Sequence, residues 1–125
     1  MKLREYILSQ TSNTSGDSVD VFAEPIFGLL EGVAIVDGTL SDNFDITLSY
    51  VNSGLGTITL FVKANMSADA MYQPRELVHA TADGAALTGT AGGDRALPII
   101  AGYVTSTLAD GGSVNTGSVI LYVWE

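Results

Sequence analysis

The sequence predicts an all-β protein: an antiparallel β-sandwich or jelly roll with an extended N-terminal arm. Three features lead to this prediction: one segment of strict apolar and polar alternation, turn signals roughly every ten residues, and an apolar segment at the C-terminal end. About seven or eight short strands separated by such turns are typical of sandwiches and jelly rolls, and not of α/β folds.

The clearest predicted strand is Phe44–Tyr50, where large apolar side chains alternate with small polar ones. A period of two places the apolar side chains on one face, so this strand is half-buried. The glycine-containing segment 52–56 then leads into 57–63, which predicts a hairpin. Residues 29–37 are typical of a mostly buried strand that ends at a turn. Residues 67–71 predict one short helical turn.

The end of the sequence predicts a second antiparallel hairpin. Its strands are 99–108 and 118–124, and the loop 109–117 joins them. Tyr122 and Trp124 lie on one face of the last strand, where they suit core packing, an oligomer contact or a ligand platform. We favour core packing or oligomer contact, because an apolar terminal strand left unpaired promotes aggregation.

The first 17 residues predict an arm and a connector, and the sandwich domain is expected over 18–125. Residues 9–18 are all polar and rich in turn formers, which is typical of a flexible connector. We expect the segment ahead of it to add a strand to a neighbouring subunit. The side chains expected to make that contact are Lys2, Leu3, Arg4, Tyr6 and Ile7.

Composition limits the classes of function. Only 15% of the residues are charged, against about 25% in a typical domain, so we expect other subunits to cover part of the apolar surface. The net charge of −9 argues against nucleic acid as a partner, because phosphate binding needs clustered lysine and arginine. No apolar stretch approaches the ~18 residues of a membrane span, and the N-terminus lacks a signal-peptide run. We therefore expect synthesis in the cytoplasm and no membrane.

The sequence offers little for catalysis or metal binding. His79 is the only histidine, cysteine is absent, and the Gly-x-Ser-x-Gly motif of hydrolases does not occur. Zinc is disfavoured for the same reason. Residues 42–45 offer carboxylate and amide oxygens but lack the spacing of a calcium loop. We therefore expect no enzyme, no cofactor and no metal, although paired carboxylates distant in sequence remain an alternative.

Three segments resemble small virion proteins of tailed bacteriophages: 72–87, 100–104 and 108–119. The resemblance depends on a Tyr-x-Pro-Arg motif at 72–75, on His79 followed by a small-residue turn, and on a Gly-Gly-x-x-x-x-Gly hairpin at 111–117. It covers 72–125, is looser over 28–62 and is absent from the first 20 residues. It implies a β-sandwich structural component, and specifically a decoration (cement) protein that binds the major capsid protein on the capsid exterior.

Charge and apolar content agree with this implied role. A net charge of −9 disfavours a lumen packed with DNA phosphates and favours the outer surface of the capsid. A closed homo-oligomer hides apolar surface, and a homotrimer matches the threefold positions of an icosahedral lattice. Two alternatives remain: a tail or head-to-tail joining component, and a carbohydrate-binding module that stacks sugars on Trp124.

Overall fold

The computed structural model describes residues 1–77 and 95–125, and the chain is all-β throughout these residues. No helix is present in this part of the chain, so nothing there could cross a membrane as a helix. The helical turn predicted at 67–71 is wrong, because this stretch leads into strand β6. The strands are β1 (Leu3–Thr11), β2 (Ser18–Val21), β3 (Ile26–Val36), β4 (Phe44–Asn52), β5 (Gly56–Met66), β6 (Ala70–Tyr72), β7 (Glu76–Leu77), β8 (Arg95–Ala96), β9 (Ile99–Gly102), β10 (Val104–Ala109) and β11 (Thr116–Trp124).

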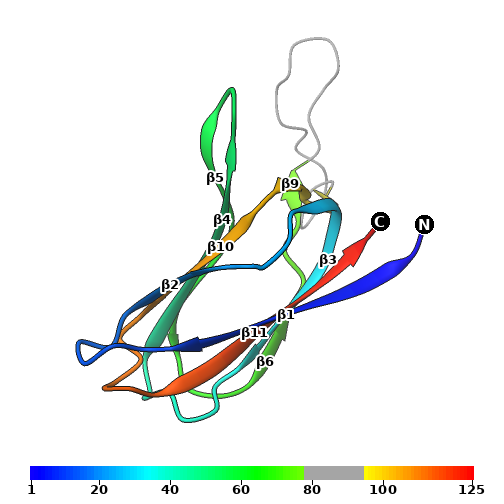
Figure 1. The fold of residues 1–125 in the computed structure, drawn as a ribbon. Helices are drawn as coiled ribbons and strands as arrows, with labels where there is room; N and C mark the ends of the chain where they lie inside the picture. Colours follow the sequence, from blue (N-terminus) through cyan, green and yellow to red (C-terminus); the bar gives the residue numbers. More distant parts are fainter. Residues whose placement is uncertain (78–94) are drawn as a thin grey trace.

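Two antiparallel sheets lie face to face (Figure 1). Sheet A has the strand order β1-β11-β3-β6, and β9 also pairs with β3; sheet B has the order β2-β10-β4-β5. Strands β7 and β8 form a separate two-stranded sheet. The predicted antiparallel β-sandwich is therefore confirmed.

The core fills the space between the two sheets, and strand alternation decides which side chains enter it. In β4, Phe44, Ile46, Leu48 and Tyr50 are all buried, as the period of two predicts. From sheet A, strand β11 contributes the buried side chains Val119, Leu121 and Val123. The predicted hairpin of β4 and β5 is also confirmed.

The long strand β3 has a bulge at Glu31 and contributes buried side chains to the core on both sides of it. Its neighbour β11 pairs Val123 with Leu30 but Tyr122 with Gly32, so Glu31 is the extra residue. An extra residue reverses the alternation. The buried side chains are accordingly Ile26 and Leu30 before the bulge, and Val33 and Ile35 after it.

The predicted N-terminal arm is wrong for residues 3–11, which form strand β1 of the same sandwich. β1 pairs with β11 without a register shift from Leu3↔Trp124 to Thr11↔Thr116. Tyr6 and Gln10 are buried, because alternate side chains of β1 point into the core. The expected flexible connector is instead a compact turn, in which the Asn13 side chain accepts hydrogen bonds from the backbone N–H groups of Ser15 (2.9 Å) and Asp17 (3.0 Å).

The predicted C-terminal hairpin is also wrong. Residues 99–108 are divided between β9 in sheet A and β10 in sheet B, and the chain changes sheet at Gly102, whose φ is +142°. A positive φ of this kind favours glycine. β10 pairs with β2 and β4, while β11 pairs with β1 and β3, so the loop after β10 joins the two sheets. Alternation reveals strands but does not reveal which strands are partners.

Candidate interaction surface

The outer side of sheet A is covered with apolar side chains that come from all five of its strands. Register places Leu3 opposite Trp124 and Ile7 opposite Ile120, and these side chains point away from the core. Several are largely exposed, such as Ile7 (61%) and Phe27 (63%). We call the following set the apolar face: Leu3, Ile7, Phe27, Leu29, Ala34, Val36, Met71, Ile99, Ala101, Ile120, Tyr122 and Trp124.

Charge is sparse on the outer side of sheet A. Glu5 lies on β1, and the Glu31 carboxylate at the bulge pairs with the Arg75 guanidinium at 2.7 Å. Single exposed apolar side chains are normal on a protein surface, but contiguous apolar patches on soluble proteins mark sites of interaction. The apolar face is therefore the candidate functional site.

Strand β3 crosses the middle of the apolar face, and its glycines allow close packing there. A Cβ on Gly28 would lie 2.3 Å from the backbone oxygen of Trp124, so only glycine fits at that position. A Cβ on Gly32 would lie 3.9 Å from the Tyr122 ring and 3.5 Å from the Met71 sulfur. The Tyr122 ring and the Met71 sulfur thus both lie within van der Waals distance of the position over Gly32, where β3 has no side chain.

Four of the seven side chains predicted as contact residues lie on the apolar face. Tyr122 and Trp124 are half-buried on β11, and Leu3 and Ile7 are exposed beside them on β1. The sequence assigned these two pairs to separate roles, one pair to an arm and the other to an oligomer contact. The pairing of β1 with β11 brings them together on one surface.

Arg4 and Tyr6 instead stabilise the end of the subunit at which the two termini meet (Figure 1). Tyr6 is buried and donates a hydrogen bond to the Glu125 carboxylate, and burial is the main reason why its pKa is raised to about 12. The Arg4 guanidinium lies 4.5 Å from the centre of the Tyr6 ring and pairs with Glu24 and, at 3.7 Å, with Glu125. Tyr6 is therefore buried inside its own subunit and cannot make the predicted neighbour contact, whereas Arg4 remains exposed.

Lys2 is exposed at the same end of the molecule. Its backbone exchanges two hydrogen bonds with Glu125, each 2.8 Å long. This pair extends the β1–β11 ladder by one residue. Lys2 therefore stands at the rim of the sheet and not on a free arm.

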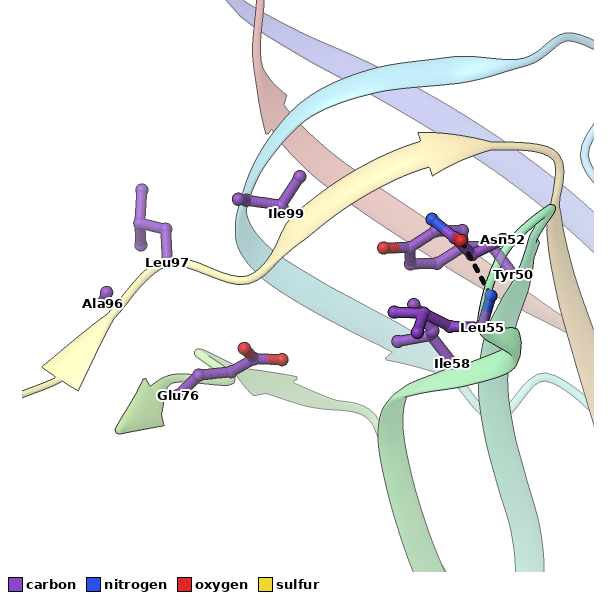
Figure 2. Close-up of a pocket in the computed structure, with 8 residues that line it drawn as sticks. All are labelled: Tyr50, Asn52, Leu55, Ile58, Glu76, Ala96, Leu97 and Ile99. Carbon is purple, nitrogen blue, oxygen red and sulfur yellow. Dashed lines mark hydrogen bonds between the residues drawn. The ribbon is translucent and has the colours of Figure 1, made fainter. Parts of the chain in front are cut away.

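A pocket of about 370 Å³ opens between the β4–β5 hairpin and the segment around β8 and β9 (Figure 2). Asn52 contributes a side-chain oxygen that already accepts hydrogen bonds from the backbone N–H groups of Gly54 (2.9 Å) and Leu55 (3.1 Å). Among the described residues of its lining, Glu76 is the one charged side chain, and the others are largely apolar. The lining consists of Tyr50, Asn52, Leu55, Ile58, Glu76, Ala96, Leu97 and Ile99. Within residues 1–77 and 95–125, the lining holds no histidine, serine or cysteine, and the sequence did not predict this pocket.

Acidic side chains elsewhere accept hydrogen bonds from backbone N–H groups near turns. The backbone N–H of Asp37 donates to the Asp69 carboxylate at 2.9 Å, which lowers the pKa of Asp69, while a hydrogen bond with Asp69 raises the pKa of Asp37. Asp45, from the weighed calcium segment, accepts a hydrogen bond from the backbone of Asn65 at 2.9 Å. Within residues 1–77 and 95–125, no three such side chains gather as metal ligands. His79 lies outside the described residues.

Comparisons with known proteins leave the family open. No protein-family model matches the chain, and no curated protein matches it either. Among solved structures, the chain is similar to the crystal structure of PirA, with 12% identity and a TM-score of 0.49 over 94% of this chain and 93% of that one.

Two structures of infectious bursal disease virus are also similar. For the Gx strain, the identity is 12% and the TM-score 0.33; for the Gt strain, they are 11% and 0.29. Each alignment covers 98% of this chain but only 36% or 37% of the virus chain. Likeness at this level carries no argument about function, so the argument depends on the surface itself.

Proposed function

We propose that this protein is a structural subunit of a virion, and specifically a decoration protein that binds the major capsid protein on the exterior of a tailed-phage head. The observation that carries the proposal is the apolar face, a broad surface that carries little charge. Such a surface suits a protein partner better than a small substrate. The resemblance to small virion proteins of tailed phages supports a virion as the setting, and the net charge of −9 favours its outer surface.

The Tyr-x-Pro-Arg motif on which that resemblance depends contacts strand β3 at its bulge, in the middle of the apolar face. Tyr72 pairs with Val33 of β3, and the Arg75 guanidinium donates to the Glu31 backbone oxygen at 3.0 Å and to its carboxylate at 2.7 Å. Because a bulge leaves its extra residue outside the ladder, an outside donor must satisfy that residue's carbonyl. The motif thus fixes the bend in the strand that crosses the middle of the face.

Binding to a shell would bury the apolar face and tie neighbouring capsid subunits together. A specific interface of standard size covers about 800 Å² on each partner. Where copies of the chain associate, their faces bind one lattice position together, and avidity compensates for modest affinity at each face. The protein then stabilises the capsid without any chemical step.

The test compares two lysine substitutions on opposite sides of the sandwich. Phe27→Lys places a charge on the apolar face, whereas Val19→Lys makes the same change on the outer side of sheet B, where Val19 is 67% exposed. Co-sedimentation with purified heads should show that Phe27→Lys weakens binding by roughly tenfold or more, while Val19→Lys changes it less than about twofold. Equal binding by both variants would refute the role of the apolar face.

Location in the particle tests the assignment to the head. Labelled protein should decorate the whole shell in electron micrographs. Labelling of one vertex or of the tail would support the tail or joining alternative instead. Binding to glycans that disappears with Trp124→Ala, without binding to heads, would support the carbohydrate-binding alternative.

A further inference from the structure

The free edge of β1 differs from every other sheet edge in the described part of sheets A and B. Natural proteins protect edge strands by making them short, bulged or charged. β2 has four residues, β6 has three and β9 has four, while β5 carries two register shifts and Lys63. β1 has nine residues, Leu3–Thr11, without proline, glycine, lysine or a register shift. It is therefore the edge best suited to accept another strand.

The backbone groups on this edge can be identified from the β1–β11 ladder. Lys2 and Glu125 exchange both of their hydrogen bonds, and the Ser12 N–H donates to Asn115. Since hydrogen-bonded pairs alternate along antiparallel strands, the even-numbered residues of β1 bond to β11. The N–H and C=O groups that point to the open edge belong to Leu3, Glu5, Ile7, Ser9 and Thr11.

We propose that this edge pairs with the same edge of a second copy of the chain, antiparallel and about a twofold axis at Ile7. In that register Ile7 faces its own copy, Glu5 faces Ser9, and Leu3 faces Thr11. All five edge residues then form hydrogen-bonded pairs, with about ten hydrogen bonds across the axis. The two A sheets become one continuous sheet.

Side chains and charge favour a copy of this chain as the occupant. A twofold contact must be self-complementary. At the axis, the Ile7 side chains (61% exposed) pack together, while the two Glu5 carboxylates each meet a serine and stay apart. The chain carries a net charge of −9, yet Leu3–Thr11 contains one arginine and one glutamate and is neutral. Two copies can therefore approach along this strand with little repulsion.

The pairing joins two apolar faces side by side on the same surface. A dimer of this kind would present to any partner twice the apolar area of one subunit. The pairing does not require that the partner be a capsid. Failure of the dimer and failure of the proposed function are therefore distinguishable, since the first is measured without heads.

The first test measures mass in solution. The full-length protein should sediment as a dimer, at twice the subunit mass of 13.0 kDa. Ile7→Pro removes an edge N–H that makes no bond to β11, and proline is tolerated on an open edge. This variant should be a folded monomer by circular dichroism and sedimentation. A wild-type monomer at about 100 µM, a concentration at which even a weak dimer with a dissociation constant in the micromolar range forms, would overturn the proposal.

A second pair of variants tests the register without relying on proline. Ser9→Lys places an ammonium opposite Glu5 of the other copy, and Ser9→Glu places a like charge there. Each substitution acts twice in the dimer, so the dissociation constant should fall about threefold for lysine and rise about threefold or more for glutamate. Val51→Lys and Val51→Glu, at a position 68% exposed on sheet B, change the net charge equally and serve as controls. Equal effects at both positions would overturn the register.

Amide hydrogen exchange gives a direct readout of the edge. Amides of Leu3, Glu5, Ile7 and Ser9 should be protected at high protein concentration and should exchange freely on dilution, and those of Leu3, Glu5 and Ser9 should also exchange freely in the monomeric Ile7→Pro. Protection of these amides only after heads are added would overturn the pairing of copies and indicate a strand from the capsid protein.

Discussion

The two outer sides of the sandwich are built by the same alternation but carry different side chains. On sheet A the outward positions hold the apolar face, with its aromatic and long aliphatic residues, except at one end of β1 and β11, where Ser9, Thr11, Thr116 and Ser118 point outward. On sheet B they hold mainly hydroxyl groups with scattered valines: Val19, Val21, Asp45, Thr47, Ser49, Val51, Thr57, Thr59, Val62, Thr105 and Thr107.

This difference separates what folding requires from what association requires. Both sheets need buried side chains on the inner face, and both have them. Threonine and serine suit a strand face in contact with water, because they combine β-branched or small side chains with a hydroxyl that water can solvate. A face of leucine, isoleucine, phenylalanine and tryptophan has no such reason to be outside. Its composition indicates a partner.

The largest expected effect tests whether the apolar face belongs to the folded subunit. Deleting residues 1–11 removes β1, the buried Tyr6 side chain and the hydrogen bonds along β11. The loss should be about 5 kcal/mol or more, comparable to the whole stability of a small domain. The truncated protein should lose its cooperative thermal transition.

The matched control is deletion of residues 1 and 2, which precede the strand and should leave the transition near its original temperature. A cooperative transition in the longer deletion would restore the arm interpretation. In that case Leu3 and Ile7 would belong to an arm and not to the apolar face of the folded subunit.

The second largest expected effect concerns a buried pair of hydrogen bonds that joins the inner faces of the two sheets. Gln10 of β1 donates to the backbone oxygen of Ser106 at 2.9 Å, and its side-chain oxygen accepts from the Ser106 hydroxyl at 2.5 Å. Gln10→Ala leaves the Ser106 hydroxyl without its partner in a fully buried site and removes one hydrogen bond from the Ser106 backbone oxygen, so the free energy of unfolding should fall by about 2–3 kcal/mol. Urea denaturation measures this change.

A second variant separates the hydrogen bonds from simple loss of volume. In Gln10→Leu with Ser106→Ala, one unsatisfied hydroxyl disappears and the space is refilled, so about half of the loss should be recovered. If Gln10→Ala costs less than about 0.5 kcal/mol, these hydrogen bonds contribute little and other contacts hold β1.

The sequence predicted individual strands well but not their partners. The alternation at Phe44–Tyr50 and the turn after it were sufficient for β4 and its hairpin, since both signals are local. Residues 9–12 were misassigned because polar side chains usually lie in loops, whereas Gln10 and Ser12 are buried and hydrogen-bonded inside the sandwich. Burial of that kind depends on Ser106 and Gly112, which are distant in sequence.

The candidate site was predicted only in part, because a face made by five strands depends on register. Tyr122 and Trp124 were correctly placed on one side of their strand. The prediction of residues 29–37 as a mostly buried strand did hold one signal of the face, since apolar residues at positions of both parities are expected where a strand is covered on both sides. Recognising the face also needed the bulge at Glu31, which the pattern of residue types does not reveal.

Solubility measurements test the comparison of the two outer sides with substitutions that change the stability of the subunit less. Phe27→Thr with Met71→Thr gives part of the apolar face the chemistry of sheet B. Both side chains are more than half exposed, so the free energy of unfolding should change by only about 0.5 kcal/mol for each. Solubility in ammonium sulfate should rise, because less apolar area remains for association.

The matched control is Val19→Thr with Val51→Thr on sheet B, where both valines are about equally exposed. These changes should leave solubility nearly unaltered, since neither valine belongs to a contiguous apolar patch. An equal gain from both pairs would show that total exposed apolar area matters and that the apolar face has no special role.

A final effect depends on pH and concerns Tyr6, which secures the end of sheet A where Leu3 and Trp124 complete the apolar face. Burial raises the pKa of Tyr6 to about 12, above the ordinary value of 10.0. Its neutral form is thus favoured in the folded state, so its contribution is complete below pH 10 and is lost as the pH rises towards 12. Tyr6→Phe lacks this contribution and also the hydrogen bond to Glu125, which is worth about 1 kcal/mol. The difference in free energy of unfolding between the two proteins should therefore be constant from pH 7 to about 9 and shrink above it. Urea denaturation at each pH measures this difference, and the other titrating groups cancel because both proteins share them. A difference that stays constant up to pH 12 would mean that Tyr6 is not held neutral by the fold and that this end of sheet A opens to water.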